Sequence, residues 1–405
     1  MSLELRWVGD DERDRVSETR MRCYAHGTDD LALYVQRLRD DKRVKPGDFL
    51  LAERDGEPIG TATSIAFTMW ARGGPVPCQG VAYVGTIKTQ RRKGGIATLI
   101  MNETLRAARE RSFVVSALMP FRGSYYERFG YGFVERRQDW TLPMGVLPKG
   151  DFDDVRFYRP DDFAGLVHFK QDVTHRTHGD IERTQAEWER TLSLAQSGHV
   201  VIDRAPGGAI RSYMAFEHVH NNGPDTVRVT EAIYQDVPAL RRLLHFLSSL
   251  RDQYSDVKIV LPADLRLNLL LAETQMTHRA NRNHPTPEAR PFNRMQVRVL
   301  DHAKLLAAMT LPAAAKGSVT VAIHEAEGGV TKLAIDIVDG RATTRATEAS
   351  PQVELPDRVW APVVFGDLNA SEAHRLGLLT TTEPRALDVL DLFASGPTPY
   401  CHEYF

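Results

Sequence analysis

The segment QRRKGGIATL, residues 90–99, has three cations and then two glycines at the predicted start of a helix. Arg91, Arg92 and Lys93 raise the local positive charge, and glycine has no side chain that would block access to the backbone N–H groups. Free N–H groups at a helix N-terminus attract phosphate. The segment is not a Walker A loop, because Gly94 rather than Ser or Thr follows Lys93, nor is it GxGxxG. It predicts a pyrophosphate site or, taken alone, a solvated charged loop.

A second candidate is Tyr126, in the aromatic segment PFRGSYYERFGYGFV, residues 120–134. Core packing and a turn at Gly130 and Gly132 would explain these aromatics without any ligand. Alternatively, Tyr126 follows a predicted strand that neighbours the strand before the cationic loop. In that case its hydroxyl would lie near the end of a ligand bound between the two strands.

The tail PYCHEYF, residues 399–405, is rich in aromatic residues. Chain ends usually fray in solvent unless something holds them. Tyr400, Tyr404 and Phe405 therefore predict a tail that packs on another surface, either simply on its own domain or beside a working site.

Elements that would position these residues are predicted from periodicity. They are a strand at 3–8, a helix at 10–25, a hairpin turning at Asp55-Gly56, a strand at 80–89, a helix at 94–112 and a strand at 113–120. The same order recurs further on, with a helix at 159–173, a hairpin at Gly207-Gly208, a strand and helix within 227–255 and a strand at 257–262. A third module starts with a strand and helix within 295–309.

Breaks in the periodicity at 147–154 and 280–293 divide the chain into three predicted domains, residues 1–150, 151–290 and 291–405. In the second domain the segment equivalent to the cationic loop, YQDVPALRRLL, has no glycine pair and contains Asp236 and Pro238. These residues disfavour a phosphate site, so the second copy is interpreted as a scaffold.

Composition limits the possible functions. The 405 residues are 42% hydrophobic and carry a net charge of −2, which gives no global basic field for nucleic acid or an anionic membrane. The three cysteines form no CxxC pair, and no disulfide framework or metal site is expected. No signal peptide and no apolar run of roughly 18 residues are found. A cytoplasmic, soluble protein is expected.

Together the cationic loop and the tyrosine segment resemble the GCN5-related N-acetyltransferases (GNAT), in which an RxxGxG/A-type loop binds the pyrophosphate of acetyl-CoA. Ile96 occupies the position of the last Gly or Ala of that pattern. An aliphatic residue there is typical of the enhanced intracellular survival (Eis) branch, whose Y-x-R-F-G-Y segment resembles residues 126–131. The resemblance implies an α/β (α+β) fold: two tandem GNAT-like domains with mixed sheets, the second degenerate, and a C-terminal sterol carrier protein-like domain.

The same resemblance implies roles for individual residues. Tyr126 matches the general acid and the C-terminal carboxylate of Phe405 the general base, while the backbone of Val84 and Thr86 would bind the pantetheine arm. Residues implied to hold the phosphates are Arg91, Arg92, Gly94, Gly95 and Ile96. Tyr83 either lines the acceptor pocket or belongs to the core, and Glu403 either joins the amine site or faces solvent. Acetyl-CoA is the implied co-substrate, and no metal is expected.

By analogy the acceptor is an aminoglycoside-like amine, a polyamine or a lysine side chain, and the assembly is a homo-hexamer of two trimers. Direct amine attack expels a thiolate whose ordinary pKa is about 8.5, and a tyrosine with a pKa near 10 can protonate it. An α-carboxylate with a pKa of about 3.5 is a poor base and requires a water relay or a desolvated site. The alternatives are a non-catalytic protein whose third domain binds an apolar ligand, and a scaffold that binds acetyl-CoA only as a sensor.

Overall fold

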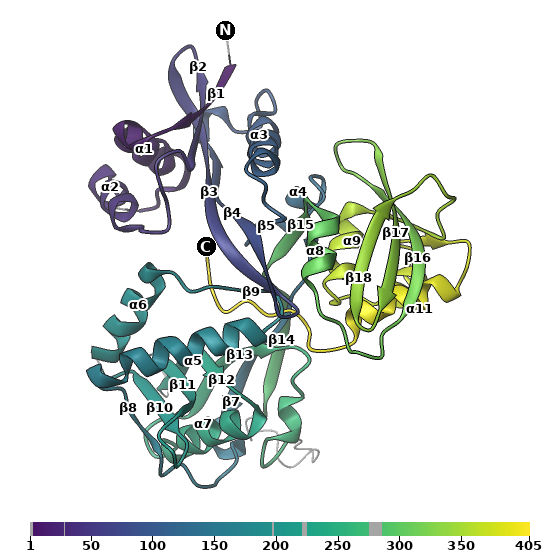
Figure 1. Ribbon diagram of the computed structural model, residues 1–405. Helices are drawn as coiled ribbons and strands as arrows, with labels where there is room; N and C mark the ends of the chain where they lie inside the picture. Colours follow the sequence, from purple (N-terminus) through teal and green to yellow (C-terminus); the bar gives the residue numbers. More distant parts are fainter. Residues whose placement is uncertain (1–2, 28, 197, 221–224, 275–285) are drawn as a thin grey trace. The chain divides into compact units, whose positions relative to one another are not determined.

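A computed structural model describes residues 3–27, 29–196, 198–220, 225–274 and 286–405 (Figure 1). Two compact units are present. The first consists of Met1–Glu135, Thr177–Ala186 and Arg294–Phe405, and the second of Arg136–Arg176 and Glu187–Asn293. The first unit thus combines segments from the N-terminal and C-terminal parts of the chain.

A mixed eight-stranded sheet organises the first unit. Its order is β1-β2-β3-β4-β5-β15-β6, with β9 paired to β3. Its strands are β1 (Leu3–Val8), β2 (Phe49–Arg54), β3 (Glu57–Ala71), β4 (Gly74–Thr86), β5 (Val115–Leu118), β15 (Gln296–Val299), β6 (Gly132–Phe133) and β9 (Asp180–Ile181).

Helices cover both faces of this sheet because apolar residues run continuously along its inner strands. In β2, Phe49 and Leu51 pack with residues of α1 (Arg13–Tyr24) and α2 (Leu31–Asp40). The alternate residues Leu50 and Ala52 pack instead with α3 (Ile96–Glu110). Successive side chains of a strand point to opposite faces, so α3 lies across the sheet from α1 and α2 (Figure 1).

Tight turns set the register of the long hairpins. Asp55-Gly56 joins β2 to β3 and Arg72-Gly73 joins β3 to β4, and all four residues have positive φ. Two successive positive φ values define the type I′ turn, whose twist matches that of the paired strands. The predicted hairpin at Asp55-Gly56 is confirmed.

A second, five-stranded sheet with the order β18-β17-β16-β19-β20 forms the rest of the first unit. Its strands are β16 (Gly317–His324), β17 (Val330–Val338), β18 (Arg341–Ala346), β19 (Val353–Pro356) and β20 (Thr380–Thr381). The accompanying helices are α8 (His302–Ala308), α9 (Asp357–Val364), α10 (Ala370–Arg375) and α11 (Arg385–Asp391). One hydrophobic core runs from Val115 and Val297 of the first sheet to Trp360 and Phe393 beside the second.

Three strands lie in sheets other than those expected from sequence. One of them is β9, within the predicted second domain, which pairs with β3 of the first sheet. β15 was predicted to start the third module, but it pairs with β5 and β6 in the first sheet. β7 (Arg136–Pro143), within the predicted first domain, belongs to the sheet of the second unit. The backbone pairing of a strand depends on distant partners, which local periodicity does not reveal. The domain limits at 150 and 290 stay predictions.

A buried arginine ties the first sheet to the second. Arg298 of β15 is fully buried, donates a hydrogen bond to the carbonyl of Phe129 (2.7 Å) and pairs with Glu325 and Glu327. Close backbone approach supports the same contact: a Cβ on Gly132 would lie 2.1 Å from the carbonyl oxygen of Arg358. The segment that follows Tyr126 is therefore packed directly on α9.

The second unit is built on a seven-stranded sheet with the order β14-β7-β13-β12-β11-β10-β8. Its further strands are β8 (Val155–Phe157), β10 (Val200–Arg204), β11 (Ile210–Val219), β12 (Thr226–Tyr234), β13 (Asp256–Pro262) and β14 (Glu288–Asn293). The helices are α5 (Phe163–Arg176), α6 (Gln185–Gln196) and α7 (Val237–Ser249). Successive residues of β10 again point to opposite faces of the sheet, where Val200 packs with α5 and Val201 packs with α7. Of the predicted break at 280–293, residues 280–285 lie outside the described residues.

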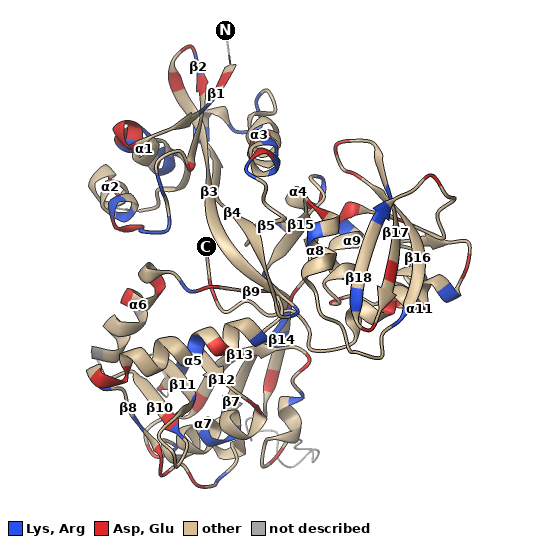
Figure 2. Ribbon diagram, viewed as in Figure 1, with Lys and Arg blue, Asp and Glu red and all other residues tan. Residues whose placement is uncertain are grey.

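The start of α7 fits the scaffold interpretation of the second copy. Asp236 caps the helix by accepting a hydrogen bond from the N–H of Ala239 (2.9 Å), and Pro238 contributes no N–H group. The carboxylate occupies the helix N-terminus where a phosphate would bind. Charges of both signs are interspersed over the elements of each unit (Figure 2), in agreement with the small net charge.

Candidate active site

The cationic loop lies between β4 and α3 and ends in a left-handed backbone. Gly94 and Gly95 have φ values of 61° and 64°, which glycine adopts without steric cost. Lys88 anchors the loop by donating to the carbonyl of Ala25 (2.8 Å). In the described chain, the first α3 N–H to reach a backbone carbonyl is that of Thr98, to Gly95 (2.8 Å). The preceding N–H groups are therefore available to an anion.

A cavity of about 650 Å³ lies at this helix start. Among the described residues, none of Arg91, Arg92 and Lys93 has a carboxylate within ion-pair distance. On the floor of the cavity, the Thr86 hydroxyl is buried and has no hydrogen-bond partner within the described ranges. The unpaired cations and free N–H groups would bind the phosphates of a ligand, and the unpaired Thr86 hydroxyl would bind a polar group elsewhere on the same ligand.

The strands beside this cavity diverge. Parallel pairing between β4 and β5 extends from Cys78 to Gly80 and then ends. On its other edge, β4 bulges against β3 at Tyr83 and Val84, and Tyr83 has a φ of 52°. A bulge of this kind redirects the local backbone. Val84 lines the cavity in the part of β4 that lies beyond its pairing with β5.

Tyr126 lies near these diverging strands. It belongs to α4 (Gly123–Glu127), which follows β5, and its side chain is 5% exposed. Burial, with smaller contributions from Tyr125 and Tyr131, raises the pKa of Tyr126 above the ordinary tyrosine value. Its hydroxyl is protonated at neutral pH, as that of an ordinary tyrosine is, and the raised pKa makes it a weaker acid.

The C-terminal tail reaches the same place. Phe405 is 9% exposed, and its ring packs on Phe67 with 5.0 Å between centroids. A ladder of hydrogen bonds holds the tail: Tyr400 N–H to His178 O (2.8 Å), Cys401 N–H to Glu135 Oε1 (2.9 Å), His402 N–H to Asp180 Oδ1 (2.8 Å), Arg294 to Glu403 O (2.9 Å) and Arg43 to Tyr404 O (3.1 Å).

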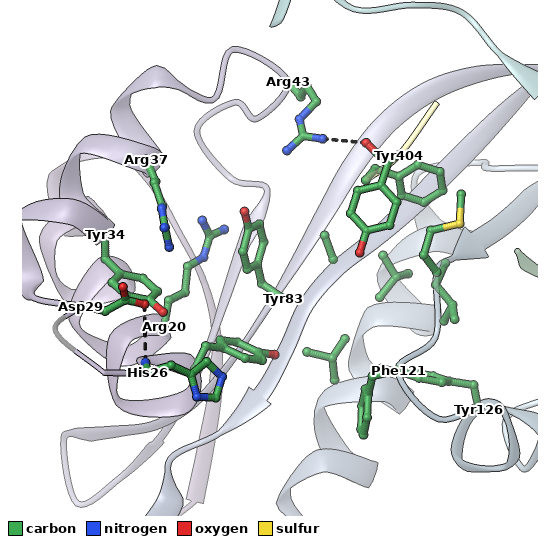
Figure 3. A pocket seen from close by; sticks show the side chains of 17 residues that line it. Arg20, His26, Asp29, Tyr34, Arg37, Arg43, Tyr83, Phe121, Tyr126 and Tyr404 are labelled. Carbon is green, nitrogen blue, oxygen red and sulfur yellow. Dashed lines mark hydrogen bonds between the residues drawn. The ribbon is translucent and has the colours of Figure 1, made fainter. Parts of the chain in front are cut away.

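A second cavity, of about 450 Å³, contains Tyr126 and Phe405 (Figure 3). Tyr24, Val84 and Phe121 line both this cavity and the cavity at the cationic loop. The two spaces therefore adjoin at the point where β4 and β5 separate. We call them the donor cavity, at the loop, and the acceptor cavity, at Tyr126.

Most residues singled out from the sequence line one of these cavities. The donor cavity is lined by Val84, Thr86, Arg91, Arg92, Gly95 and Ile96, and the acceptor cavity by Tyr83, Val84, Tyr126 and Phe405. Gly94 belongs to the loop but not to the lining. Glu403 lies outside both linings, where it is 5% exposed and pairs with Arg183 at 3.0 Å.

Several lining residues were not identified from the sequence. Arg128 lines the donor cavity and donates to the Thr98 hydroxyl (3.1 Å) at the start of α3. Its position two residues after Tyr126 could have identified Arg128 as a site residue from the sequence. Tyr24 and Arg20 come from α1, whose sequence reads as an ordinary charged helix and gives no such signal.

The described residues were also compared with the expectations for cysteines, metal ligands and membrane-spanning helices. Cys23 and Cys78 are buried, and burial raises the pKa of Cys23 to about 12. Over the described ranges, no group of three or more His, Cys, Asp or Glu residues is arranged to hold a metal ion. No helix in the same ranges is long and apolar enough to cross a membrane.

Comparison with known proteins agrees with this geometry. Residues 4–134 and 179–299 each match a family described as Acetyltransferase (GNAT) domain, and residues 303–402 match the Sterol carrier protein domain. An uncharacterized N-acetyltransferase of Streptomyces avermitilis is 25% identical over 89% of each chain. N-acetyltransferase Eis of Mycobacterium tuberculosis is 25% identical over 88% of this chain and 89% of its own. The crystal structure of Eis1 from Mycobacterium abscessus covers 100% of both chains with a TM-score of 0.79 at 19% identity.

Fold and site together define a GNAT acetyltransferase with two GNAT domains and a sterol carrier protein domain. The chain belongs to the GNAT acetyltransferases, and over most of its length it is similar to N-acetyltransferases named Eis. The predicted family and fold class are confirmed, and the chain is an enzyme of a family that uses acetyl-CoA.

Proposed function

We propose that this protein transfers the acetyl group of acetyl-CoA to a primary amine by direct attack, in the acceptor cavity. The observation that carries the proposal is the junction of the donor and acceptor cavities at Tyr24, Val84 and Phe121. A thioester bound from the donor side would end there, within the space that Tyr126 lines.

The donor cavity supplies the groups that acetyl-CoA requires. Free N–H groups at the start of α3 and the side chains of Arg91 and Arg92 would hold the pyrophosphate. The backbone of Val84 and Thr86 would bind the pantetheine arm, because both residues line the cavity at the separated strands. When bound, acetyl-CoA supplies the activated acetyl group.

Tyr126 and the α-carboxylate of Phe405 would act at the reacting atoms. The amine nitrogen bonds to the thioester carbonyl carbon, and the carbon–sulfur bond breaks. Tyr126, whose hydroxyl is protonated at neutral pH, then gives its proton to the departing thiolate and regains one from the solvent. The carboxylate of Phe405 would accept the proton of the attacking amine through water, since a carboxylate is a weak base.

The acceptor classes implied by the family, an aminoglycoside-like amine, a polyamine or a lysine side chain, stay proposals, as do the hexamer and the cytoplasmic location. Fold alone does not determine a substrate. The 450 Å³ acceptor cavity is at the lower end of the range for small-molecule sites, which favours a small acceptor.

Release of free CoA thiol from acetyl-CoA across an amine panel tests the proposal. We expect turnover with at least one amine, and a kcat that falls about 10²- to 10⁴-fold in Tyr126→Phe because the general acid is lost. Acetyl-CoA affinity, measured by calorimetry, should not change. Tyr158→Phe, in the second unit, is the matched control and should keep full activity.

Binding of acetyl-CoA without turnover of any amine would contradict the proposal and favour the sensor alternative. Full activity in Tyr126→Phe would remove Tyr126 from the mechanism while leaving acetyl transfer intact.

A further inference from the structure

The wall of the acceptor cavity formed by α1, α2 and the segment after α2 is cationic. Arg20, Arg37 and Arg43 line it, and among the described residues of the lining Asp29 is the only one with a carboxylate side chain (Figure 3). A cavity built for polycations would show the opposite balance of charge, because a cationic ligand gains from carboxylates and is repelled by guanidinium groups.

Arg20 is the least expected of these residues. Its side chain is 3% exposed, its Nη2 donates to the Thr63 hydroxyl (2.6 Å), and its guanidinium lies 3.9 Å from the ring centroid of Tyr83. In the part of the chain that the structure describes, its Nε has no hydrogen-bond partner and no carboxylate lies within ion-pair distance. Leaving a buried cation and its donor unpaired is costly, which points to a ligand that completes the pairing.

The negative charges at the cavity are those of Asp29 and of the α-carboxylate of Phe405, which the proposed function assigns to the amine. Arg43 is paired with Asp41 (2.7 Å), so it contributes little net charge. Arg37 lies over the ring of Tyr34 (5.4 Å) and has no ion-pair partner among the described residues. Asp29 accepts a hydrogen bond from the N–H of His26 (3.5 Å) and interacts with the Tyr34 hydroxyl.

We propose that the acceptor is an amine that also carries a carboxylate, bound with its carboxylate at Arg20 and Arg37 and its amine toward Tyr126 and Phe405. This proposal rests on the acetyl transfer proposed above and narrows its acceptor to small amino acids and related amino carboxylates. Guanidinium groups bind carboxylates with charge-assisted hydrogen bonds, and among the described residues the Arg20 guanidinium has the Thr63 hydroxyl as its one hydrogen-bond partner, which leaves other N–H groups without one.

Matched amines test the proposal. Lysine is compared with 1,5-diaminopentane, which is lysine without its carboxylate, and 4-aminobutyrate with butylamine, using thiol release as the assay. We expect kcat/KM to be about 10-fold or more higher for each carboxylate-bearing amine. O-phosphoethanolamine against ethanolamine distinguishes a carboxylate site from a phosphate site.

Arg20→Met should lower the ratio of kcat/KM between lysine and 1,5-diaminopentane about 10- to 100-fold, mainly through KM for lysine. Methionine has a similar shape and removes an uncompensated charge, so the fold should persist. Arg37→Met, at the exposed side of the cavity, should lower the ratio less. Arg39→Met, whose side chain is 64% exposed on α2 and outside the lining, is the control and should leave the ratio unchanged.

Faster acetylation of 1,5-diaminopentane and butylamine than of their carboxylate-bearing partners, an unchanged ratio in Arg20→Met, or a stronger preference for O-phosphoethanolamine would each overturn the proposal while leaving acetyl transfer standing. Failure of every amine despite acetyl-CoA binding would instead contradict the proposed function. In that case, calorimetry of lysine with the CoA-loaded protein decides about the subsite: binding weakened by Arg20→Met supports it, and no binding to the wild type overturns it.

Discussion

At the scale of single residues, His178 illustrates how the tail is fixed at the site. Its Nδ1 accepts the N–H of Arg72 (3.2 Å), so its Nε2 carries the proton and donates it to the carbonyl of Phe365 (2.9 Å). The ring also stacks on Phe365, and its own carbonyl accepts the N–H of Tyr400. Only the neutral form fits these contacts, and burial lowers the pKa of His178 to about 3.

This depressed pKa predicts a pH-dependent stability. The unfolded chain binds a proton at this histidine below about pH 6.5, whereas the folded chain does not, so stability is lost as pH falls from 6.5 toward 3. Between pH 7.5 and 4.5, His178 should account for a fall of about 2–3 kcal/mol in the free energy of unfolding. Urea denaturation of wild type and His178→Gln at both pH values measures it.

In His178→Gln we expect a smaller pH effect and a lower stability at pH 7.5, by about 1–3 kcal/mol, because buried groups lose their partners. His168→Gln, whose side chain is 77% exposed, is the control and should behave like the wild type. Equal pH effects in wild type and His178→Gln would contradict the assignment.

Residue identity and order were enough to predict part of the site. Tyr126, Tyr83 and Phe405, far apart in the sequence, line one cavity. Arg20 could not be predicted, because a cation in a charged helix looks solvent-exposed until the sheet beneath it is known. Glu403 was a candidate because it lies near the chain end, and its pairing with Arg183 depends on a contact 220 residues away.

At the scale of elements, the start of α3 determines the donor cavity. A Cβ on Gly95 would meet no heavy atom within 4 Å, so space does not require glycine there. Position 95 favours glycine because its φ is 64°, a value that other residues rarely adopt. With this backbone conformation, the N–H groups that begin α3 lie at the cavity.

Gly95→Ala should lower stability by about 1–2 kcal/mol through its left-handed backbone and weaken acetyl-CoA binding about 10-fold. Gly208→Ala is the matched control, since Gly208 has a φ of 86°, lies in the second unit and also leaves room for a Cβ. It should lose similar stability but keep its acetyl-CoA affinity, as measured by calorimetry. Equal affinities in the two variants would contradict the role assigned to the α3 N-terminus.

Strand and helix positions in the first domain followed from periodicity, and most lie within a few residues of the prediction. Leu99 of α3 is 39% exposed although it is apolar, while Ile96, Ile100 and Leu105 are buried with Met101. Met101 rather than Leu99 completes the face because the sheet contacts a stripe rotated toward that side of the helix. The sheet partners of β15 and β7 depend on tertiary contacts that sequence spacing does not encode.

At the scale of the whole molecule, the first unit joins the eight-stranded sheet, the sterol carrier protein domain and the tail through one core. The short segment Thr177–Ala186 belongs to the same unit and supplies Asp180 and Arg183, which hold the tail. The chain therefore uses contacts from three distant segments to keep Phe405 in the acceptor cavity. The aromatic residues of the tail predicted that it packs on another surface, and only the family resemblance indicated that this surface is the site.

The central claim is that acetyl transfer occurs where the tail end and Tyr126 meet, and an extended chain tests it most directly. A few Gly-Ser residues are added after Phe405 and, as a control, the same residues before Met1. We expect the C-terminal extension to lower kcat about 100-fold or more, because it removes the α-carboxylate, without changing acetyl-CoA affinity. The N-terminal extension should have no effect. Full turnover by the chain extended after Phe405 would contradict the claim.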